Sequence, residues 1–297
     1  MTNTMKNILV ACDFTAFSVD ALKFAHELAS QSDATIHLLH VVEYPFYYET
    51  TFGVQPYWQN HNLLNELTQQ ANTRFEKLEK TFGGDGVKMK FYVERGNVDT
   101  IITEKIDELD IDLIVMGAHG HNPNDVLAGR HLLRVIRSSP VPVIAFRNTR
   151  ALKDIKRIAF SSLLDGNEAA AIQRVKQLQR FLNAELHIVR VNTPAHFMTD
   201  RQAEAAFAQY ARQFDLRDAT FHICSDNYEQ DGIVNFCRDE KIDLLAMATH
   251  GRKGLAYLFR GSITEDVIEI TDIPVWTYTM HKEITSDVVM EGTMQLA

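Results

Sequence analysis

A glycine-rich loop in the second half of the chain has residue types that suit the binding of an anion. The segment MATHGRKGLAYLFRGS, residues 247–262, follows an apolar run and precedes the helical pattern of residues 263–268. Glycines let a backbone bend and approach a ligand closely, and a helix start offers unpaired N–H groups with a partial positive charge. This combination suits phosphate. The candidate phosphate-binding residues are Gly251, Gly261, Ser262 and Thr264.

The same loop also has an ordinary structural explanation. Glycine after a strand and serine before a helix are common turn and capping residues. The chain contains no GKS or GKT, so the loop is not a Walker phosphate loop, and the turn after the first predicted strand lacks GxGxxG. The glycine spacing by itself therefore leaves phosphate binding and plain turn formation both open.

Histidines near the corresponding loop of the first half are the other candidates for chemistry. His119, His121 and His131 include a His-x-His spacing, which occurs in metal sites, but no cysteine or carboxylate cluster completes a ligand set. The chain has no GxSxG nucleophile elbow, no His-Glu-x-x-His and no paired carboxylates suited to acid–base chemistry. We therefore predict neither a metal site nor a catalytic residue.

Length and composition restrict the class of protein. The 297 residues are enough for two domains, and 45% hydrophobic with 23% charged residues is typical of a folded protein. A net charge of −9 without a Lys/Arg cluster argues against a nucleic-acid-binding surface. The three cysteines form no CxxC pair, which fits a reducing compartment. Without a signal-peptide core or a run of 18 apolar residues, we expect a cytoplasmic protein and no membrane partner.

The chain repeats itself. The segment KNILVACDFTAFSVDALKFAHELASQSDATIHLLHVV from Lys6 aligns without a gap with KRIAFSSLLDGNEAAAIQRVKQLQRFLNAELHIVRVN from Lys156. Further on, DIDLIVMGAHG ending at Gly120 matches KIDLLAMATHG ending at Gly251. Each half therefore carries the same unit, and the first half has extra residues in its middle.

Apolar runs alternate with helical patterns along both halves, which is typical of parallel sheets covered on both faces. We predict an α/β fold with two tandem, doubly wound, five-stranded parallel-sheet domains at residues 1–148 and 149–281, and a polar tail at 282–297. The predicted strands lie near residues 7–12, 35–42, 87–93, 112–116, 142–146, 156–161, 185–191, 219–224, 243–247 and 274–279. The predicted helices of the first half lie near residues 18–31, 61–81, 98–109 and 125–137.

This fold class predicts where a ligand would bind. In doubly wound sheets, ligands lie at the carboxyl ends of the strands where the strand order reverses. The relevant loops follow the first and fourth strands of each half. They begin at Asp13 and Gly117 in the first half, and near Leu163 and Ala248 in the second.

The residues of these loops resemble those of the universal stress protein family. The similarity is carried by the opening NILVACDFTAFSVDALKFA, by the spacing Gly-2x-Gly-9x-Gly-Ser after the fourth strand, and by the end strand SSPVPVIAF. It covers both halves, so the chain resembles a tandem universal stress protein, with a fold of the adenine-nucleotide α-hydrolase type.

The resemblance implies an adenine nucleotide (ATP, ADP or AMP) as ligand. In the nucleotide-binding members, an aspartate after the first strand contacts adenosine, main-chain groups at the end of the second strand hold the base, and the glycine loop holds the phosphates. The matching positions in the first half are Asp13, Val41, Gly117, Gly120, Gly129 and Arg130. Those in the second half are Val191, Gly251, Gly261, Ser262 and Thr264.

Each half departs from the family pattern at a different place. In the first half only eight residues separate Gly120 from Gly129, and Arg130 stands where the pattern has serine. Two roles are open for Arg130: its guanidinium contacts a phosphate, or its bulk fills the phosphate site. In the second half Leu163 stands at the position of Asp13. The first half therefore favours the adenosine part of the ligand, and the second half favours the phosphates.

An aromatic insert and two apolar end strands suggest contacts with protein. The insert, near residues 44–62, holds Tyr47 and Trp58. It is expected to cover the ligand end of the first domain, to act as a lid, or to bind a partner. The runs PVPVIAF and IPVWTY would be costly as bare sheet edges. We predict that they pair antiparallel and join the two domains as an intrachain pseudo-dimer.

These observations predict a cytoplasmic stress-response protein that binds adenine nucleotide and acts through conformation or partner contact, with at most weak ATP hydrolysis. One alternative is a scaffold with degenerate sites that binds a protein partner or forms a homo-oligomer. Another is a protein that binds a different phosphorylated or apolar ligand. Neither nucleic acid nor membrane is a predicted partner.

Overall fold

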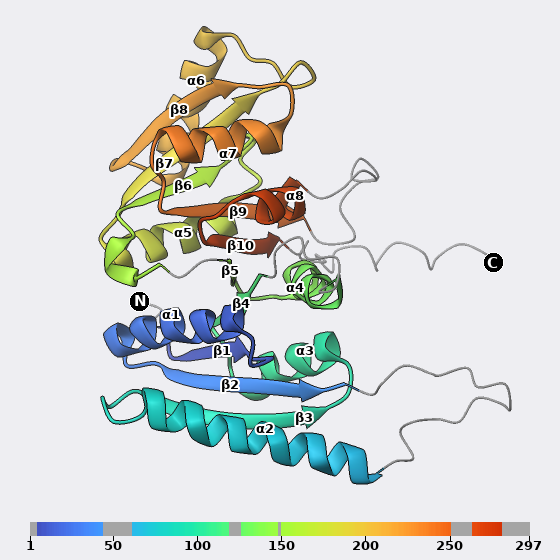
Figure 1. Ribbon diagram of the computed structural model, residues 1–297. Coiled ribbons are helices and arrows are strands. Elements are labelled where there is room, and N and C mark those ends of the chain that lie inside the picture. The colour runs from blue at the N-terminus through green and yellow to red at the C-terminus, as the bar shows by residue number, and fades with distance from the viewer. Residues whose placement is uncertain (1–4, 44–60, 119–125, 148–149, 251–262, 281–297) are drawn as a thin grey trace, which may run out of the picture.

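The computed structural model describes residues 5–43, 61–118, 126–147, 150–250 and 263–280. Its two halves lie one above the other, with the N-terminal half at the bottom of Figure 1 and the C-terminal half at the top. The aromatic insert lies outside the described residues apart from its last two positions, which begin a helix. The tail at 282–297 is also outside them.

The first half alternates strands and helices as the apolar runs predict. Its elements are β1 (Asn7–Ala11), α1 (Ala16–Ser32), β2 (Thr35–Val42), α2 (His61–Phe82), β3 (Lys88–Arg95), α3 (Val98–Glu108), β4 (Leu113–Gly117), α4 (Val126–Ser138) and β5 (Val143–Phe146). Each predicted strand and helix of this half is confirmed to within two residues at its ends.

The second half repeats this order after a short 3₁₀ helix, η2 (Leu152–Asp154). Its elements are β6 (Arg157–Ser161), α5 (Ala169–Leu182), β7 (Glu185–Asn192), α6 (Asp200–Phe214), β8 (Ala219–Ser225), α7 (Glu229–Asp239), β9 (Leu244–His250), α8 (Ile263–Ile270) and β10 (Val275–Met280). The equivalent helices α1 and α5 both end at a residue in the left-handed conformation, Asp33 and Asn183, residue types that tolerate this backbone.

All ten strands form one continuous sheet, in the order β3-β2-β1-β4-β5-β10-β9-β6-β7-β8. Within each half every strand pair is parallel, whereas β5 and β10 pair antiparallel, with Ile144 opposite Trp276. The predicted pairing of the two end strands is thus confirmed. This pairing reverses the strand direction. The carboxyl ends of the first-half strands therefore point one way along the strand axis, and those of the second-half strands point the opposite way.

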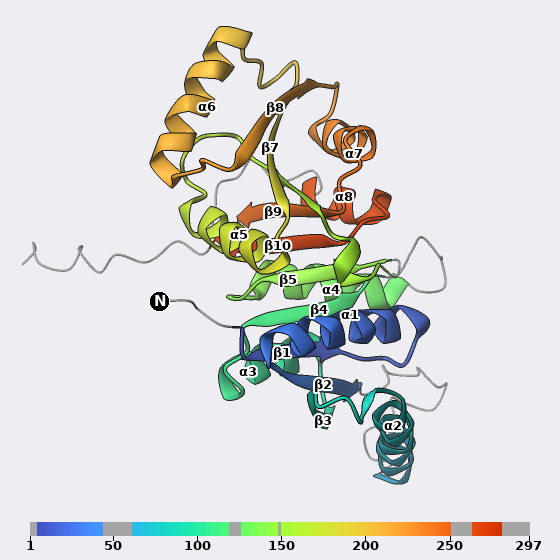
Figure 2. The same ribbon diagram turned by 90° about the vertical axis from the view of Figure 1, so that its left-hand side faces the viewer.

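Helices cover both faces of the sheet and enclose two apolar layers. One layer packs α1, α2, α5 and α6 on the sheet and includes Phe24, Phe146 and Phe160. The other packs α3, α4, α7 and α8 on the opposite face. Figure 2 shows this for the second half, with α5 and α6 on one side of the strands and α7 and α8 on the other. Both layers run across the join between the halves.

Polar contacts also cross the join. Thr277 Oγ1 donates a hydrogen bond to the carbonyl of Val143 over 3.2 Å. Thr279 Oγ1 donates to the carbonyl of Ile136. Arg137 of α4 forms an ion pair with Glu265 of α8. The two halves are therefore joined by backbone pairing, apolar packing and side-chain contacts together.

Candidate functional site

A cavity of about 250 Å³ opens at the carboxyl ends of β1, β2 and β4. In the first half β1 lies between β2 and β4, so the strand order reverses beside it and this is the switch point where doubly wound folds bind ligands. Val98 and Ile102 of α3 and His131 of α4 complete its walls. The cavity is lined by Ala11, Cys12, Asp13, Ser18, Leu39, His40, Val41, Glu43, Val98, Ile102, Met116, Gly117 and His131.

A strained turn after β1 carries Asp13 to the edge of this cavity. Phe14, the next residue, has a φ of 64°, which is uncommon for a bulky residue. Asp13 Oδ1 accepts hydrogen bonds from the Thr15 N–H (3.0 Å) and the Thr15 hydroxyl (2.6 Å). Thr15 in turn caps α1 by accepting from the Ser18 N–H. The carboxylate is therefore oriented by the start of α1 while remaining exposed to solvent.

The ring of Phe14 holds the turn against α2. Its centroid lies 5.1 Å from that of Phe75 and 4.7 Å from that of His40. The guanidinium of Arg74 lies 5.3 Å above the same ring, which is a favourable cation–π distance. These contacts stabilise the unusual backbone conformation beside Asp13.

His40 is an uncharged hydrogen-bond acceptor at the cavity. Its Nδ1 lies 2.8 Å from the carbonyl oxygen of Cys12. A carbonyl only accepts, so Nδ1 donates and Nε2 is the acceptor of the neutral ring. Burial lowers the pKa of His40. Burial also raises the pKa of the Cys12 thiol to about 11, so neither side chain carries a charge at neutral pH.

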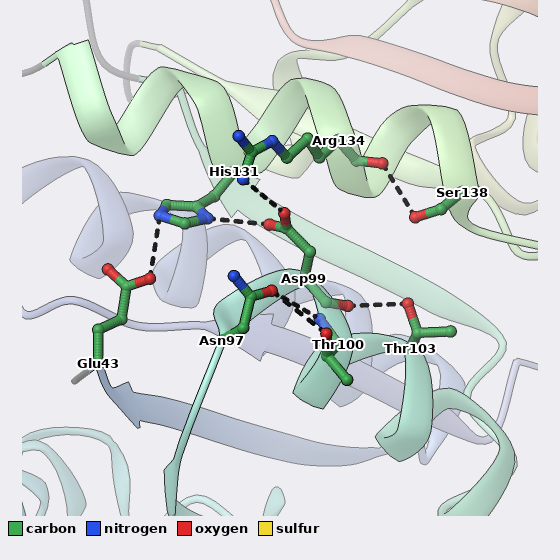
Figure 3. Close-up of polar contacts among 8 residues, drawn as sticks. All are labelled: Glu43, Asn97, Asp99, Thr100, Thr103, His131, Arg134 and Ser138. Carbon is green, nitrogen blue, oxygen red and sulfur yellow. Dashed lines mark hydrogen bonds and ion pairs between the residues drawn. The ribbon is translucent and has the colours of Figure 1, made fainter. Parts of the chain in front are cut away.

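His131 bridges two carboxylates at the other side of the cavity, as Figure 3 shows. Its Nδ1 lies 2.9 Å from Asp99 Oδ1, and its Nε2 lies 3.4 Å from Glu43 Oε1. Arg134 NH1 donates to the second oxygen of Asp99 over 3.1 Å. Because Glu43 follows β2 and Asp99 lies in the first turn of α3, these contacts connect α4 to both elements.

The predicted residues of the first half lie partly at this cavity. Asp13, Val41 and Gly117 line it. Gly117 also has a packing role, because a Cβ there would lie 2.7 Å from the backbone of Phe17 in α1. Gly129 and Arg130 lie within the first turns of α4, and Gly120 is outside the described residues.

The second half has a different set of side chains at the equivalent edge. Arg190 takes the place of His40, and only 4% of it is exposed. Its NH1 donates to the Leu163 carbonyl over 2.6 Å and its NH2 to the His196 carbonyl over 3.3 Å. Glu229, the first residue of α7, takes the place of Val98, the first residue of α3. Two larger charged residues thus stand where the first half has its cavity.

The predicted residue Val191 is buried in this half. Only 4% of it is exposed, and a Cβ added to Gly232 of α7 would lie 2.5 Å from Val191 Cγ1. Helix α7 therefore packs closely on β7 at the position predicted to hold a base. Thr264 is buried in the first turn of α8. Gly251, Gly261 and Ser262 are outside the described residues.

Three polar residues at the first-half cavity were not predicted from the sequence. His40 and Glu43 come from the end of β2 and line the cavity, and Asp99, in the first turn of α3, contacts the lining residue His131. Charged or polar residues at the carboxyl end of the second strand are a signal that could have identified His40 and Glu43. Asp99 has no such signal, because its position depends on how α3 packs against α4.

Neither a metal-ligand cluster nor a membrane-spanning helix occurs in the part of the chain that the structure describes. There, no group of three or more His, Cys, Asp or Glu side chains is placed to hold a metal ion. None of the described helices is long and apolar enough to cross a membrane.

The fold and cavity define a tandem, doubly wound α/β protein with a cavity at the switch point of its first half. The model of the universal stress protein family matches residues 4–147 and 164–278. The chain belongs to the universal stress protein family, and its two matches make it a tandem member.

Known proteins similar to this chain support that assignment. Universal stress protein Slr1230 of Synechocystis is 24% identical, over 92% of this chain and all of that protein. Universal stress protein A homolog 1 of Coxiella burnetii is 29% identical, over 47% of this chain and 94% of its own. A universal stress protein from Archaeoglobus fulgidus has a similar fold, with a TM-score of 0.73 at 18% identity, covering 93% of this chain and 98% of the other.

Proposed function

We propose that this chain is a stress-response protein that binds an adenine nucleotide in the cavity of its first half. The observation that carries the proposal is that Asp13 and Val41, the two positions matching the adenosine contacts of the family, line one cavity at the switch point. The nucleotide acts by changing conformation or partner contact and is at most slowly hydrolysed.

The chemistry of the lining supports adenosine as the recognised part. Asp13 and the Nε2 of His40 accept hydrogen bonds, and the hydroxyl groups of a ribose and the amino group of adenine donate them. The apolar side chains of Val41, Val98 and Ile102 offer a surface for the flat base. Pockets of mainly apolar lining with a few oriented polar groups are typical of small-molecule sites.

We further propose that each chain binds one nucleotide, in the first half. Arg190 and Glu229 occupy the equivalent edge of the second half, and Val191 is buried beneath Gly232. The binding roles expected for Val191, Gly251, Gly261, Ser262 and Thr264 stay predictions. The phosphate-binding roles expected for Gly117, Gly120, Gly129 and Arg130 also stay predictions.

A substitution that carries the second half's residue into the first half tests the proposal. Val98→Glu places at the cavity the residue type that stands at Glu229, so AMP binding is expected to fall by about tenfold or more as the carboxylate takes the space of the ligand. Isothermal titration calorimetry with AMP provides the measurement, and one AMP per wild-type chain is expected.

The reciprocal variant is the matched control. Glu229→Val changes the equivalent position of the second half and should leave AMP binding unchanged. If Val98→Glu binds AMP as tightly as the wild type while its circular dichroism spectrum shows a folded protein, the first-half cavity is not the nucleotide site.

A further inference from the structure

One side chain of β2 contacts both residues that flank Asp13. His40 Nδ1 donates to the carbonyl of Cys12, the residue before Asp13, over 2.8 Å. The ring of Phe14, the residue after Asp13, lies against the His40 ring with 4.7 Å between their centroids. His40 therefore contacts the turn between β1 and α1 on either side of the acid.

The turn needs support from outside its own segment. Phe14 has a φ of 64°, a conformation that costs a bulky residue free energy and persists only where neighbouring contacts hold it. The Cys12 N–H donates to the Leu39 carbonyl over 2.8 Å, and the bond from His40 adds a second tie at the Cys12 carbonyl. Cys12 is thus held to β2 through both of its backbone polar groups.

The second half has an equivalent tie made by a different residue type. Arg190 stands at the position of His40, and Leu164, with a φ of 60°, stands at that of Phe14. Arg190 is the longer side chain and donates to the next carbonyl of the turn, that of Leu163, over 2.6 Å. The feature common to both halves is a side-chain donor from the second strand to a carbonyl of the strained turn.

We propose that His40 is a positioning residue, which acts through the Cys12 carbonyl to hold the Asp13 carboxylate where it accepts from the ribose of the nucleotide. The proposal rests on the adenine-nucleotide function proposed above and adds a residue to that site. An acceptor that is oriented before the ligand arrives lowers the ordering cost of binding. This role belongs to Nδ1 and is separate from any contact that the ligand makes with Nε2.

His40→Asn and His40→Leu separate the two ring nitrogens. The amide of asparagine places an N–H donor near the position of Nδ1 and no group at that of Nε2. Leucine is similar in size to asparagine and has no donor. Both variants lose Nε2, so the difference between them reports the hydrogen bond to the Cys12 carbonyl.

Titration calorimetry of the full chain with AMP tests the proposal. His40→Leu is expected to bind AMP about threefold to tenfold more weakly than His40→Asn, as is typical of one lost hydrogen bond. In an Asp13→Ala background the two variants should bind AMP equally, because the residue that His40 positions is gone. In an Asp165→Ala background, the matched control in the second half, the difference should persist.

Hydrogen exchange of the Thr15 amide gives a second reading without ligand. This N–H donates to Asp13 Oδ1 over 3.0 Å, so its exchange should be faster in His40→Leu than in His40→Asn. Circular dichroism spectra establish that each variant is folded.

The outcomes separate this inference from the proposed function. If the two variants bind AMP equally while Asp13 is present, or if their difference persists in Asp13→Ala, His40 does not act through Asp13, while nucleotide binding stands. Equal Thr15 exchange in the two variants would also contradict the positioning role. If the wild type does not bind AMP, the proposed function fails, and the inference fails with it.

Discussion

At the scale of single residues, the turn after β1 combines strain with an oriented carboxylate. Phe14 has a φ of 64°, and Leu164, at the equivalent position of the second half, has a φ of 60°. Both halves therefore keep the same turn, but only the first has an acid at its edge, Asp13 in place of Leu163. The turn is therefore a shared requirement of the fold, whereas the carboxylate of Asp13 belongs to the first half alone.

Replacing Asp13 should weaken ligand binding. Asp13→Ala is expected to reduce the free energy of AMP binding by about 1–3 kcal/mol, because adenosine donors lose their acceptor. Titration calorimetry checks this. The control is Asp165→Ala, which removes the nearest acid of the second half, a residue that accepts from the Asn167 N–H over 3.0 Å. If Asp13→Ala binds AMP as tightly as the wild type, Asp13 does not contact the ligand and contributes only to the turn after β1.

A buried carboxyl group in the second half should make stability depend on pH. Glu168 accepts from the Tyr210 hydroxyl over 2.9 Å and from the Ser162 hydroxyl, and burial raises its pKa. With a raised pKa the folded state binds the proton more tightly than the unfolded state. This contribution to stability is therefore present at low pH and is lost as pH rises through the pKa of the folded protein.

Glu168→Gln should remove this dependence. At pH 8 the variant is expected to have a larger free energy of unfolding than the wild type, because the charged form no longer has to be buried. The difference should shrink as pH falls toward 4. Urea unfolding followed by circular dichroism at several pH values gives the comparison. A difference that grows as pH falls would show that Glu168 is stabilising as a carboxylate.

At the scale of elements, the pairing of β5 with β10 closes two apolar edges at once. Trp276 is 2% exposed and lies opposite Ile144 in the antiparallel register. Bare apolar edge strands invite aggregation. Here each edge is covered by the other, so the two domains support each other's folding.

Removing the large side chain at this join should destabilise the whole chain. Trp276→Ala is expected to lower the free energy of unfolding by about 3–5 kcal/mol, as is typical of a buried aromatic residue. Urea unfolding followed by circular dichroism provides the measurement. Tyr228→Ala, at a residue 63% exposed, should change it by no more than about 0.5 kcal/mol. Similar effects of the two substitutions would argue against a close join.

The same elements show what the sequence can and cannot predict. The strands and the β5–β10 pairing follow from local signals: apolar runs, an internal repeat and two end strands that need cover. Which side chains meet at the carboxyl ends of the strands depends on tertiary packing, and no local sequence pattern predicts that packing. Arg190 and Glu229 lie at the equivalent end of the second half because β7 and α7 bring them there. By contrast, the position of Gly129 inside α4, which begins at Val126, agrees with the helix predicted near residues 125–137.

At the scale of the whole molecule, one sheet carries two unequal halves. The backbone repeat is preserved, while the carboxyl ends of its two sets of strands face opposite edges. One edge has a cavity with an exposed acid, and the other has a buried arginine and a closely packed helix. This asymmetry suits a protein in which one half binds the ligand and the other supports it through the continuous sheet.

The most direct measurement is a crystal structure of the full chain grown with AMP. We expect one AMP per chain, with its ribose beside Asp13, its base beside Val41 and no AMP at the carboxyl ends of β6, β7 and β9. AMP bound in the second half beside Leu163 and Val191, with the first-half cavity free of it, would contradict the proposed site and the proposed division of roles between the halves.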